Sequence, residues 1–365
     1  MAEIRIEGLH KAFANFVAVR DSNFVIEDRS FFVMLGPSGC GKTTTLRMIA
    51  GLELPTRGRI GLDGEDVTFK RAAERDIAFV FQMFALYPHM SVARNIGFPL
   101  KCEGVARAEI RRRVQETARL LRIEGLIDSR VSKLSGGDRQ RVSLGRAIIR
   151  RPKAFLMDEP LGALDSEFRH LMCAELRDLH DRIGATTVYV THDQIEAMSM
   201  ADSIAVMNHG VVEQIGAPQE IYDRPATMFV ADFIGSPPMN LLPFEGALGR
   251  GESHVSYFGA RIEVPEIFDE APSGALSLGV RPEQVAISDS GALRGRVFAV
   301  EYLGANQIVT IEIERAFVKA RLSSSRAARV GETVGVSFLP GKLVVFNAIT
   351  GRAAHSALFE GAHRG

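Results

Sequence analysis

Short apolar runs alternate with longer amphipathic runs along the first part of the chain. Phe31–Leu35 is uniformly apolar and predicts a buried strand, followed by a glycine-rich turn and a helix that ends near Gly51. Residues 154–157 and 187–190 predict two more buried strands, and polar residues follow each of them. Apolar strands separated by helical patterns indicate a parallel sheet, with chemistry expected at the carboxyl ends of its strands.

Two later regions have different patterns. Residues 89–150 are helical throughout, and we expect their arginine-rich faces, such as residues 111–113, to be solvated. Beyond residues 235–238 the pattern changes to short alternating runs broken by Gly, Pro and Ser, which is typical of a small all-β barrel or sandwich. These runs are residues 254–264, 275–287, 294–313 and 333–346. We therefore expect an α/β domain over residues 1–235 with a helical subdomain at about 89–150, a β domain over 236–352, and a loose tail over 353–365 that contains His355 and His363.

Composition narrows the function classes. The chain has 365 residues, and its 44 Lys and Arg balance 44 Asp and Glu, so no net charge attracts nucleic acid. Cys40, Cys102 and Cys173 lack paired spacing, which favours a reducing compartment without disulfides or a zinc site. The first residues do not resemble a secretory signal, and the most apolar stretch, residues 77–88, is too short to span a bilayer. Any membrane role is therefore expected to come through a partner.

Residues 36–43, GPSGCGKT, fit the P-loop pattern between a predicted strand and a predicted helix. In such a loop the backbone N–H groups surround a phosphate, Lys42 reaches the β- and γ-oxygens, and Thr43 offers its hydroxyl to Mg²⁺. The alternative is a purely structural glycine-rich turn. Cys40 is then either a small loop residue or a thiol whose pKa is lowered by the helix N-terminus.

Two carboxylates and a histidine are expected at the same sheet edge. Asp158 ends the strand at residues 154–157 and can hold the Mg²⁺ shell, while Glu159 beside it can polarise a water. His192 follows the strand at residues 187–190 and is expected to contact the γ-phosphate, although a lone histidine is often structural. A phosphate cradle, a metal, an oriented water and charge neutralisation are the requirements of phosphoryl transfer.

A second anion site is predicted far from the first. Leu134–Ser135–Gly136–Gly137–Asp138 is a bare turn that opens into a charged helix, and a helix start of small residues attracts anions. An acidic residue, Asp138, stands at its mouth. One chain thus carries two predicted phosphate sites.

Taken together, these motifs resemble the ATP-binding subunit of an ATP-binding-cassette transporter over essentially the whole chain. Its signature LSGGQ reads LSGGD here, Gln82 matches the Q-loop, Asp158 and Glu159 match the Walker B pair, Asp165 ends the D-loop, and His192 matches the switch. The resemblance implies an α/β P-loop ATPase fold with a helical subdomain, followed by a small all-β, OB-like regulatory domain. It also explains the second anion site, because in this family two subunits face each other head to tail and each signature closes over the partner's ATP.

The resemblance assigns roles to individual residues, with ATP and Mg²⁺ as cofactors. The catalytic residues would be Glu159, His192, Lys42 and Gln82, and the metal site would be Thr43, Gln82 and Asp158. The ATP site would consist of Phe13, which stacks on adenine, and Val19, Gly36, Pro37, Ser38, Gly39, Cys40, Gly41, Lys42, Thr43, Thr44 and Gln82. The residues that act in trans would be Ser135, Gly136, Gly137, Asp138 and Asp165.

The C-terminal part resembles the regulatory domain of sugar and polyol importers of the maltose and glycerol-3-phosphate types. The matching stretches are residues 235–240, 278–283 and 300–304. Importers of polyamines or ferric iron stay open as alternatives, and a soluble, non-transport ATPase of this family is a more distant one. The resemblance implies a second ATPase subunit, two integral membrane permease subunits that dock near residues 84–90, and indirectly a periplasmic or surface solute-binding protein. The chain would lie peripherally on the cytoplasmic face of the cell membrane, without a nucleic-acid partner.

Two departures from the family bear on the dimer. Asp138 replaces the signature glutamine and places a negative charge near a polyanionic ligand. The D-loop has Gly162 and Ala163 where sugar-importer relatives usually have Ser and Asn. Both departures leave open whether two identical copies close tightly or whether the partner is a second, different ATPase subunit.

Overall fold

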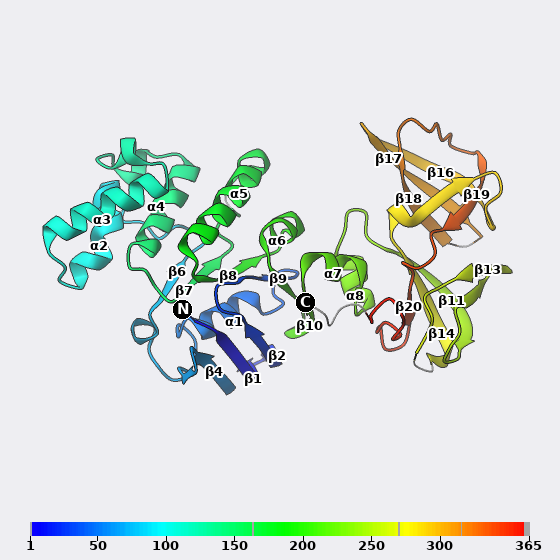
Figure 1. Ribbon diagram of the computed structural model, residues 1–365, viewed down its shortest axis with the longest axis horizontal. Coiled ribbons are helices and arrows are strands. Elements are labelled where there is room, and N and C mark those ends of the chain that lie inside the picture. Colours follow the sequence, from blue (N-terminus) through cyan, green and yellow to red (C-terminus); the bar gives the residue numbers. More distant parts are fainter. Residues whose placement is uncertain (1, 163, 269–270, 315, 361–365) are drawn as a thin grey trace. The chain divides into compact units, whose positions relative to one another are not determined.

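The protein consists of two compact units, Met1–Pro218 and Gln219–Gly365, in a computed structural model (Figure 1). The structure describes residues 2–162, 164–268, 271–314 and 316–360. The domain boundary expected at residues 235/236 falls inside the second unit. Two short helices before it, α7 (Pro218–Asp223) and α8 (Met228–Phe233), belong with the β-rich part because their contacts are made there.

A six-stranded sheet in the order β10-β9-β3-β8-β7-β6 forms the centre of the first unit. Four of its neighbouring pairs are parallel, and β10 is antiparallel to β9. Every residue of β3 is buried, as expected for a strand covered on both faces. The strands are β3 (Phe31–Leu35), β6 (Ile77–Val80), β7 (Ala154–Asp158), β8 (Thr186–Thr191), β9 (Ser203–Asn208) and β10 (Val211–Gly216).

A second, antiparallel sheet in the order β2-β1-β4-β5 packs on the same core. Ile4 and Ile6 of β1 are buried while Arg5 and Glu7 are exposed, so the period-2 pattern sets which face is inside. The strands are β1 (Ile4–Phe13), β2 (Phe16–Ile26), β4 (Arg57–Leu62) and β5 (Glu65–Asp66). Helix α1 (Lys42–Ile49) contributes Leu46 and Met48 to this core, so the element that follows the P-loop is anchored by both sheets.

The chain segment that connects β6 to β7 is helical, as the sequence predicts, and its helices lie beside the sheet (Figure 1). They are α2 (Val92–Cys102), α3 (Arg107–Leu120) and α4 (Gly136–Ile148), with 3-10 helices η2 (Glu124–Leu126) and η3 (Val131–Lys133); η1 (Ala72–Glu74) lies before β6. A Cβ at Gly145 would lie 3.0 Å from Leu121 and 3.1 Å from Ile96, so the absence of a side chain lets α4 approach its neighbours. Helix α5 (Ser166–Ile183) follows β7, and the shorter helix α6 (Gln194–Met200) follows β8.

In its described residues the second unit is all-β apart from α7, whose first residue closes the first unit, α8, and the 3-10 helix η4 (Pro282–Gln284). Its described strands form three sheets, β11-β14-β20, β12-β13 and β15-β19-β16-β17-β18, around one apolar core. The strands are β11 (Asn240–Leu248), β12 (His254–Tyr257), β13 (Ala260–Glu263), β14 (Ala271–Val280), β15 (Val285–Ser288), β16 (Leu293–Leu303), β17 (Asn306–Ile313), β18 (Ala316–Ser323), β19 (Thr333–Phe338) and β20 (Val344–Asn347). The residue patterns did not predict β11, which contains a proline and a glycine, or β18, whose burial alternates imperfectly.

The tail expected to be loose from residue 353 is instead part of this unit as far as it is described. Ala353 forms a β-bridge with Phe346, and the Ala354 N–H donates to Val345. The Phe268 N–H donates to the His355 carbonyl, and Ser356 is only 3% exposed. Backbone hydrogen bonds, which amino-acid composition does not predict, hold this segment in place. His363 lies outside the described residues.

No helix in the described part of the chain is long and apolar enough to cross a lipid bilayer.

Candidate functional site

The predicted P-loop joins the end of β3 to the start of α1, and two of its glycines lie close to neighbouring backbone. A Cβ at Gly36 would lie 2.2 Å from the Met207 carbonyl oxygen, and one at Gly41 would lie 2.4 Å from that of Ala18. Gly41 also has a φ of 107°, which favours glycine. The loop can therefore approach β2 and β9 only because these positions lack side chains.

Lys42 lies at the centre of this loop and is only 4% exposed. Its Nζ donates to the carbonyl oxygens of Gly36 at 2.7 Å and of Pro37 at 3.0 Å. A buried ammonium held by two carbonyl groups presents a positive charge to whatever the loop surrounds.

The surroundings of Cys40 do not lower the pKa of its thiol, as a reactive cysteine at a helix N-terminus would require. Burial raises the pKa of Cys40, and the nearby Lys42 ammonium offsets this only in part. Cys40 is 3% exposed, so it is a small buried loop residue.

Thr43 and Asp158 meet at the carboxyl edge of the sheet. The Thr43 hydroxyl donates to Asp158 Oδ1 at 2.8 Å, and Asp158 is the last residue of β7. Burial raises the pKa of Asp158, the hydrogen bond from Thr43 lowers it, and the neighbouring Glu159 raises it further. Two hard oxygen donors beside the P-loop are a donor set that suits Mg²⁺.

Glu159 lies between two other predicted site residues from different parts of the chain. Its Oε1 is 3.2 Å from His192 Nδ1, and its Oε2 accepts from Gln82 Nε2 at 3.4 Å. Its backbone has a φ of 43°, and its N–H donates to the Val190 carbonyl of β8 at 3.0 Å. β6, β7 and β8 are neighbours in the sheet, so their carboxyl ends bring Gln82, Glu159 and His192 together.

Phe13, the residue predicted to stack on adenine, lies at the hairpin between β1 and β2. The rings of Phe13 and Phe16 stack at 5.3 Å, and Lys11 Nζ lies 4.8 Å from the Phe13 ring centre. Phe13 is 38% exposed, so it keeps ring surface for a flat ligand, while Val19 is fully buried. Phe16, the cross-strand partner of Phe13, is more exposed than Phe13 and was not among the residues predicted from the sequence.

Two family models and several known proteins match this chain. A family model described as ABC transporter matches residues 19–162, and a TOBE domain model matches residues 278–346. The trehalose/maltose import ATP-binding protein MalK of Thermococcus litoralis is 45% identical, covering 97% of this chain and 100% of its own. The sn-glycerol-3-phosphate import ATP-binding protein UgpC of Ruegeria pomeroyi is 44% identical, covering 96% and 99%.

The chain belongs to the ABC transporter ATPase family.

Further relatives agree with this assignment. The trehalose import ATP-binding protein SugC of Mycobacterium tuberculosis is 42% identical, covering 96% of this chain and 98% of its own. The solved structure of cbiO1 from Clostridium perfringens, described as part of the ABC transporter complex cbiONQ, has a TM-score of 0.56 and 27% identity and covers 60% of this chain and 89% of that one. The predicted family and the predicted fold class, an α/β ATPase followed by an all-β domain, are confirmed, and ATP binding follows from the family.

The signature of this ABC ATPase begins α4. Ser135 is the N-cap, and its Oγ accepts from the Asp138 N–H at 3.2 Å while its hydroxyl donates to Asp138 Oδ2 at 2.7 Å. Asp138 Oδ1 also lies 3.6 Å from the Arg141 guanidinium. Asp138 is thus held by its own helix. Its carboxylate accepts the hydrogen bond of the Ser135 hydroxyl, the group that the family resemblance assigns to the partner's nucleotide.

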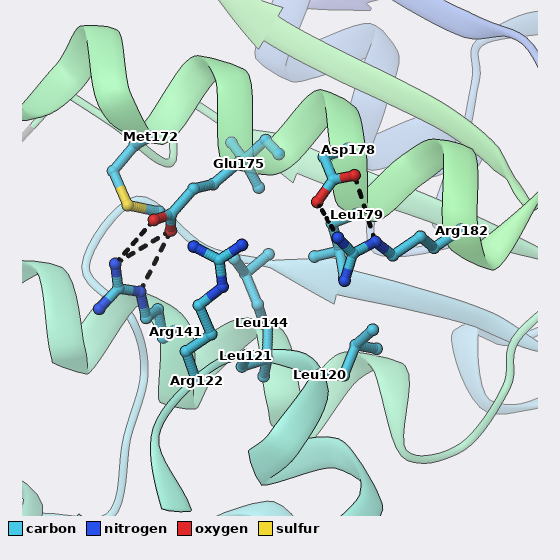
Figure 2. A pocket seen from close by; sticks show the side chains of 11 residues that line it. Leu120, Leu121, Arg122, Arg141, Leu144, Met172, Glu175, Asp178, Leu179 and Arg182 are labelled. Atoms are coloured by element: carbon cyan, nitrogen blue, oxygen red, sulfur yellow. Dashed lines mark hydrogen bonds and ion pairs between the residues drawn. The ribbon is translucent and has the colours of Figure 1, made fainter.

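The signature helix is tied to α5 across a small cleft. Figure 2 shows Arg141 of α4 paired with both oxygens of Glu175, at 3.0 Å each from its terminal nitrogen, beside a second pair between Arg182 and Asp178. The D-loop runs from β7 to α5; a Cβ at Gly136 would lie 3.4 Å from Leu164 Cδ2, so the signature starts against this loop. Ala163 lies outside the described residues, whereas Gly162, Leu164 and Asp165 are described.

A cluster behind His192 was not expected from the sequence. Arg169 of α5 donates to the Leu164 carbonyl at 2.9 Å and to Asp193 Oδ2 at 2.9 Å. Glu196, only 3% exposed, accepts from the hydroxyls of Tyr189 and Thr191 at 2.8 Å each. Burial raises the pKa of Glu196, which these two hydrogen bonds lower in part. The spacing of residues in the sequence does not predict the cluster, because its members belong to α5, β8 and α6 and meet only when these elements pack together.

Proposed function

We propose that the chain is the ATP-hydrolysing subunit of an importer for a carbohydrate or a polyol, including polyol phosphates. The observation that carries hydrolysis is Glu159, which lies between Gln82 and His192 and directly beside the Thr43–Asp158 pair. Support for the solute class comes from relatives that span nearly the whole chain and are named for the import of trehalose, maltose and sn-glycerol-3-phosphate.

The residues of the P-loop and its aromatic neighbour bind ATP in this proposal. The N–H groups of residues 38–43 surround the phosphates, Lys42 offsets their charge, and Thr44 extends the helix start. Phe13 stacks on the adenine beside Val19. This arrangement is supported by the buried Lys42 ammonium and by the exposed face of Phe13.

Thr43 and Asp158 would hold Mg²⁺, and Gln82 would be a further ligand. The support is the hydroxyl–carboxylate pair at 2.8 Å, which supplies hard oxygen donors. When bound, the ion neutralises charge on the phosphate oxygens. Gln82 has its amide carbonyl available for this, since its nitrogen is the atom that faces Glu159.

Glu159 is the general base that takes a proton from the attacking water, and His192 holds the carboxylate in place. The positive φ of Glu159 and its backbone hydrogen bond to Val190 aim the side chain away from the strand and into the site. His192 Nδ1 at 3.2 Å and the Gln82 amide at 3.4 Å limit the rotamers that Glu159 can adopt. Water is thereby oriented before it reacts.

A second ATPase subunit completes the site in trans. Ser135, Gly136, Gly137 and Asp138 of one subunit would close over the ATP of the other, and Asp165 would contact the facing loop. Support comes from the helix N-terminus that these residues form, where N–H groups lack partners within the helix. Both a homodimer and a heterodimer with a related ATPase fit this arrangement.

Two integral membrane permease subunits would dock beside the Q-loop and hold the chain on the cytoplasmic face of the membrane. A cleft there is lined by Met83, Phe84, Leu86, Pro88, Val131, Ser132 and Arg139. Met83 is 80% exposed and offers apolar surface at this cleft. The floor of the cleft is fixed to the signature helix, since Ser143 and Arg146 of α4 donate to the Phe84 carbonyl. A periplasmic or surface solute-binding protein would act indirectly, through these permeases.

The test is reconstitution of the chain with its permease subunits in vesicles, with and without Mg²⁺. ATP hydrolysis that depends on Mg²⁺ and is stimulated by a di- or monosaccharide or by a polyol phosphate is the expected result. Stimulation by a polyamine or by ferric iron alone would contradict the solute class while leaving the ATPase assignment in place.

A further inference from the structure

The Arg169 guanidinium lies where three functional segments of the first unit meet. One nitrogen donates to the backbone carbonyl of Leu164 in the D-loop, and another donates to Asp193 Oδ2, both at 2.9 Å. Its Nε lies 3.6 Å from Glu196 Oε1 and makes no hydrogen bond, although the atom is buried. The side chain as a whole is 28% exposed, so these contacts are partly shielded from water.

The partners of Arg169 hold the segment that carries His192. Asp193 directly follows His192 and is the N-cap of α6, where its Oδ1 accepts from the N–H groups of Ile195 and Glu196. Thr191 directly precedes His192; its hydroxyl donates to Glu196 and accepts from the Asp193 N–H. The residues on both sides of His192 are thus fixed by one hydrogen-bonded cluster.

The other contact of Arg169 lies on the surface where a second subunit is expected. Leu164 precedes Asp165, one of the residues proposed to act in trans, and its side chain lies against Gly136 at the start of the signature helix. A displacement of the D-loop backbone therefore changes the position of the Leu164 carbonyl. Because a guanidinium is planar and holds its N–H groups in a fixed fork, it cannot follow one partner without pulling on the other.

We propose that Arg169 is a positioning residue that couples the D-loop at Leu164 to the backbone on either side of His192. Contact of a second subunit with the D-loop then sets the distance between His192 and Glu159, so that hydrolysis becomes efficient only in the closed dimer. This inference rests on the proposed ATPase function and adds a route by which the partner reaches the catalytic carboxylate. Among the described residues, Arg169 itself forms no hydrogen bond or ion pair with Glu159 or with the P-loop.

Arg177 supplies a matched control on the same helix. It lies two turns further along α5 and holds the opposite end of α6, donating to the Met200 carbonyl at 2.9 Å and to Asp202 at 2.8 Å. Arg177→Gln and Arg169→Gln each remove one arginine that joins α5 to α6. Only Arg169→Gln removes a contact to the D-loop.

Steady-state kinetics of the full chain test the coupling. We expect Arg169→Gln to lower kcat by about ten- to a hundredfold and to change KM for ATP by less than about threefold, because a misplaced catalytic group affects the reaction more than binding. Arg169→Lys should recover only part of the loss, since an ammonium cannot fork to both partners. Asp193→Asn keeps the N-cap and removes the charged partner, so it should add little to Arg169→Gln. Arg177→Gln should lower thermal stability and leave kcat near the wild-type value.

Amide hydrogen exchange of the nucleotide-free chain gives a second readout. Exchange at Ile195 and Glu196 should be faster in Arg169→Gln than in wild type, and unchanged in Arg177→Gln. An unchanged kcat in Arg169→Gln, or an equal loss in Arg177→Gln, would overturn the coupling, and so would unchanged exchange at Ile195 and Glu196. If wild-type protein failed to hydrolyse ATP, the proposed function would fall, whereas the exchange comparison would still decide whether Arg169 holds the His192 segment.

Discussion

Glu159 has the surroundings that a general base needs, because its two oxygens face His192 and Gln82 while its backbone is fixed by β8. Glu159→Gln keeps the size and both neighbours and removes the ability to accept a proton. We expect hydrolysis to fall by about a hundredfold or more while ATP still binds. Single-turnover hydrolysis and equilibrium ATP binding would measure the two effects, with Lys42→Ala as the contrasting variant that weakens binding itself. Near-normal turnover in Glu159→Gln would move the role of base to His192.

Asp138 is the residue whose role the structure changes most. From the sequence its charge was expected to face the partner's ATP; in the structure it also takes the Ser135 hydroxyl as a hydrogen-bond donor. Asp138→Gln should therefore have two opposite effects. It should tighten ATP-driven dimerisation by about 1 kcal/mol, because a partly screened negative charge near the phosphates is removed.

The same substitution should weaken the isolated chain. A carboxylate in the first turn of α4 stabilises the helix by about 0.3–1 kcal/mol, so the melting temperature should fall slightly. Sedimentation of Glu159→Gln protein with and without Asp138→Gln, at low and high salt, would measure the first effect, and the gain should shrink as salt rises. A dimer that is unchanged or weaker would show that the Asp138 charge does not reach the nucleotide.

At the scale of single elements, a buried arginine holds the helices of the second unit. Arg281 is fully buried, donates to the carbonyl groups of Tyr222, Ala231 and Ile234, and lies 4.2 Å from the Tyr222 ring centre. Arg281→Gln would leave several buried carbonyl groups without donors, at a cost of about 3 kcal/mol. Calorimetry of the full chain should show a lower transition for the second unit only, with exposed Arg294→Gln as the control. A transition that stays in place would contradict this role.

We expect a buried histidine to make the first unit less stable in acid. His180 of α5 is 7% exposed, with Nε2 3.1 Å from the Arg29 carbonyl and Nδ1 2.9 Å from the Thr187 hydroxyl. Burial, and then the nearby Arg177 charge, lower the pKa of His180 from its ordinary 6.5. The unfolded chain then takes up the proton first, so the stability that neutral His180 contributes is complete above about pH 6.5 and is lost as the pH falls from there through the lowered pKa.

Thermal unfolding between pH 8 and pH 5 would check this expectation. His180→Gln can still accept from Thr187 and donate to Arg29 but does not titrate, so its melting temperature should fall less than that of wild type as the pH is lowered. His89→Gln, at an exposed histidine, should follow the wild-type curve. Parallel curves for wild type and His180→Gln would contradict the linkage.

At the scale of the whole molecule, the chain is one subunit of a transporter complex. A substitution on its docking surface should therefore impair transport without impairing ATP hydrolysis by the isolated chain. Leu86→Glu places a charge in the cleft beside the Q-loop without touching the P-loop or Glu159. ATP hydrolysis by the isolated chain should stay at the wild-type level, whereas transport by the reconstituted complex should fall by about tenfold or more, since a desolvated charge at an interface costs over 1 kcal/mol. Ile349→Glu, at an exposed apolar residue of the second unit, is the control. Unimpaired transport in Leu86→Glu would place the permease contact elsewhere.

The sequence alone determined the features that depend on neighbours in the chain. The P-loop, the strand before Asp158 and Glu159, and the signature at the start of α4 are contiguous, so spacing and residue type suffice to predict them. The parallel sheet followed too, because apolar strands separated by helices have few other ways to bury both faces. The same local patterns predicted the all-β character of residues 236–352.

Only the tertiary structure decided contacts between residues that are distant in the chain. Gln82 and Glu159 are 77 positions apart, and their meeting depends on β6 and β7 being neighbours in the sheet. The link from Leu164 through Arg169 to Asp193, and the pairing of residues 353–356, likewise depend on which elements pack together. Local propensity specifies where strands and helices form, whereas these contacts are selected by the free energy of burying all the elements at once, which no single segment of the sequence contains.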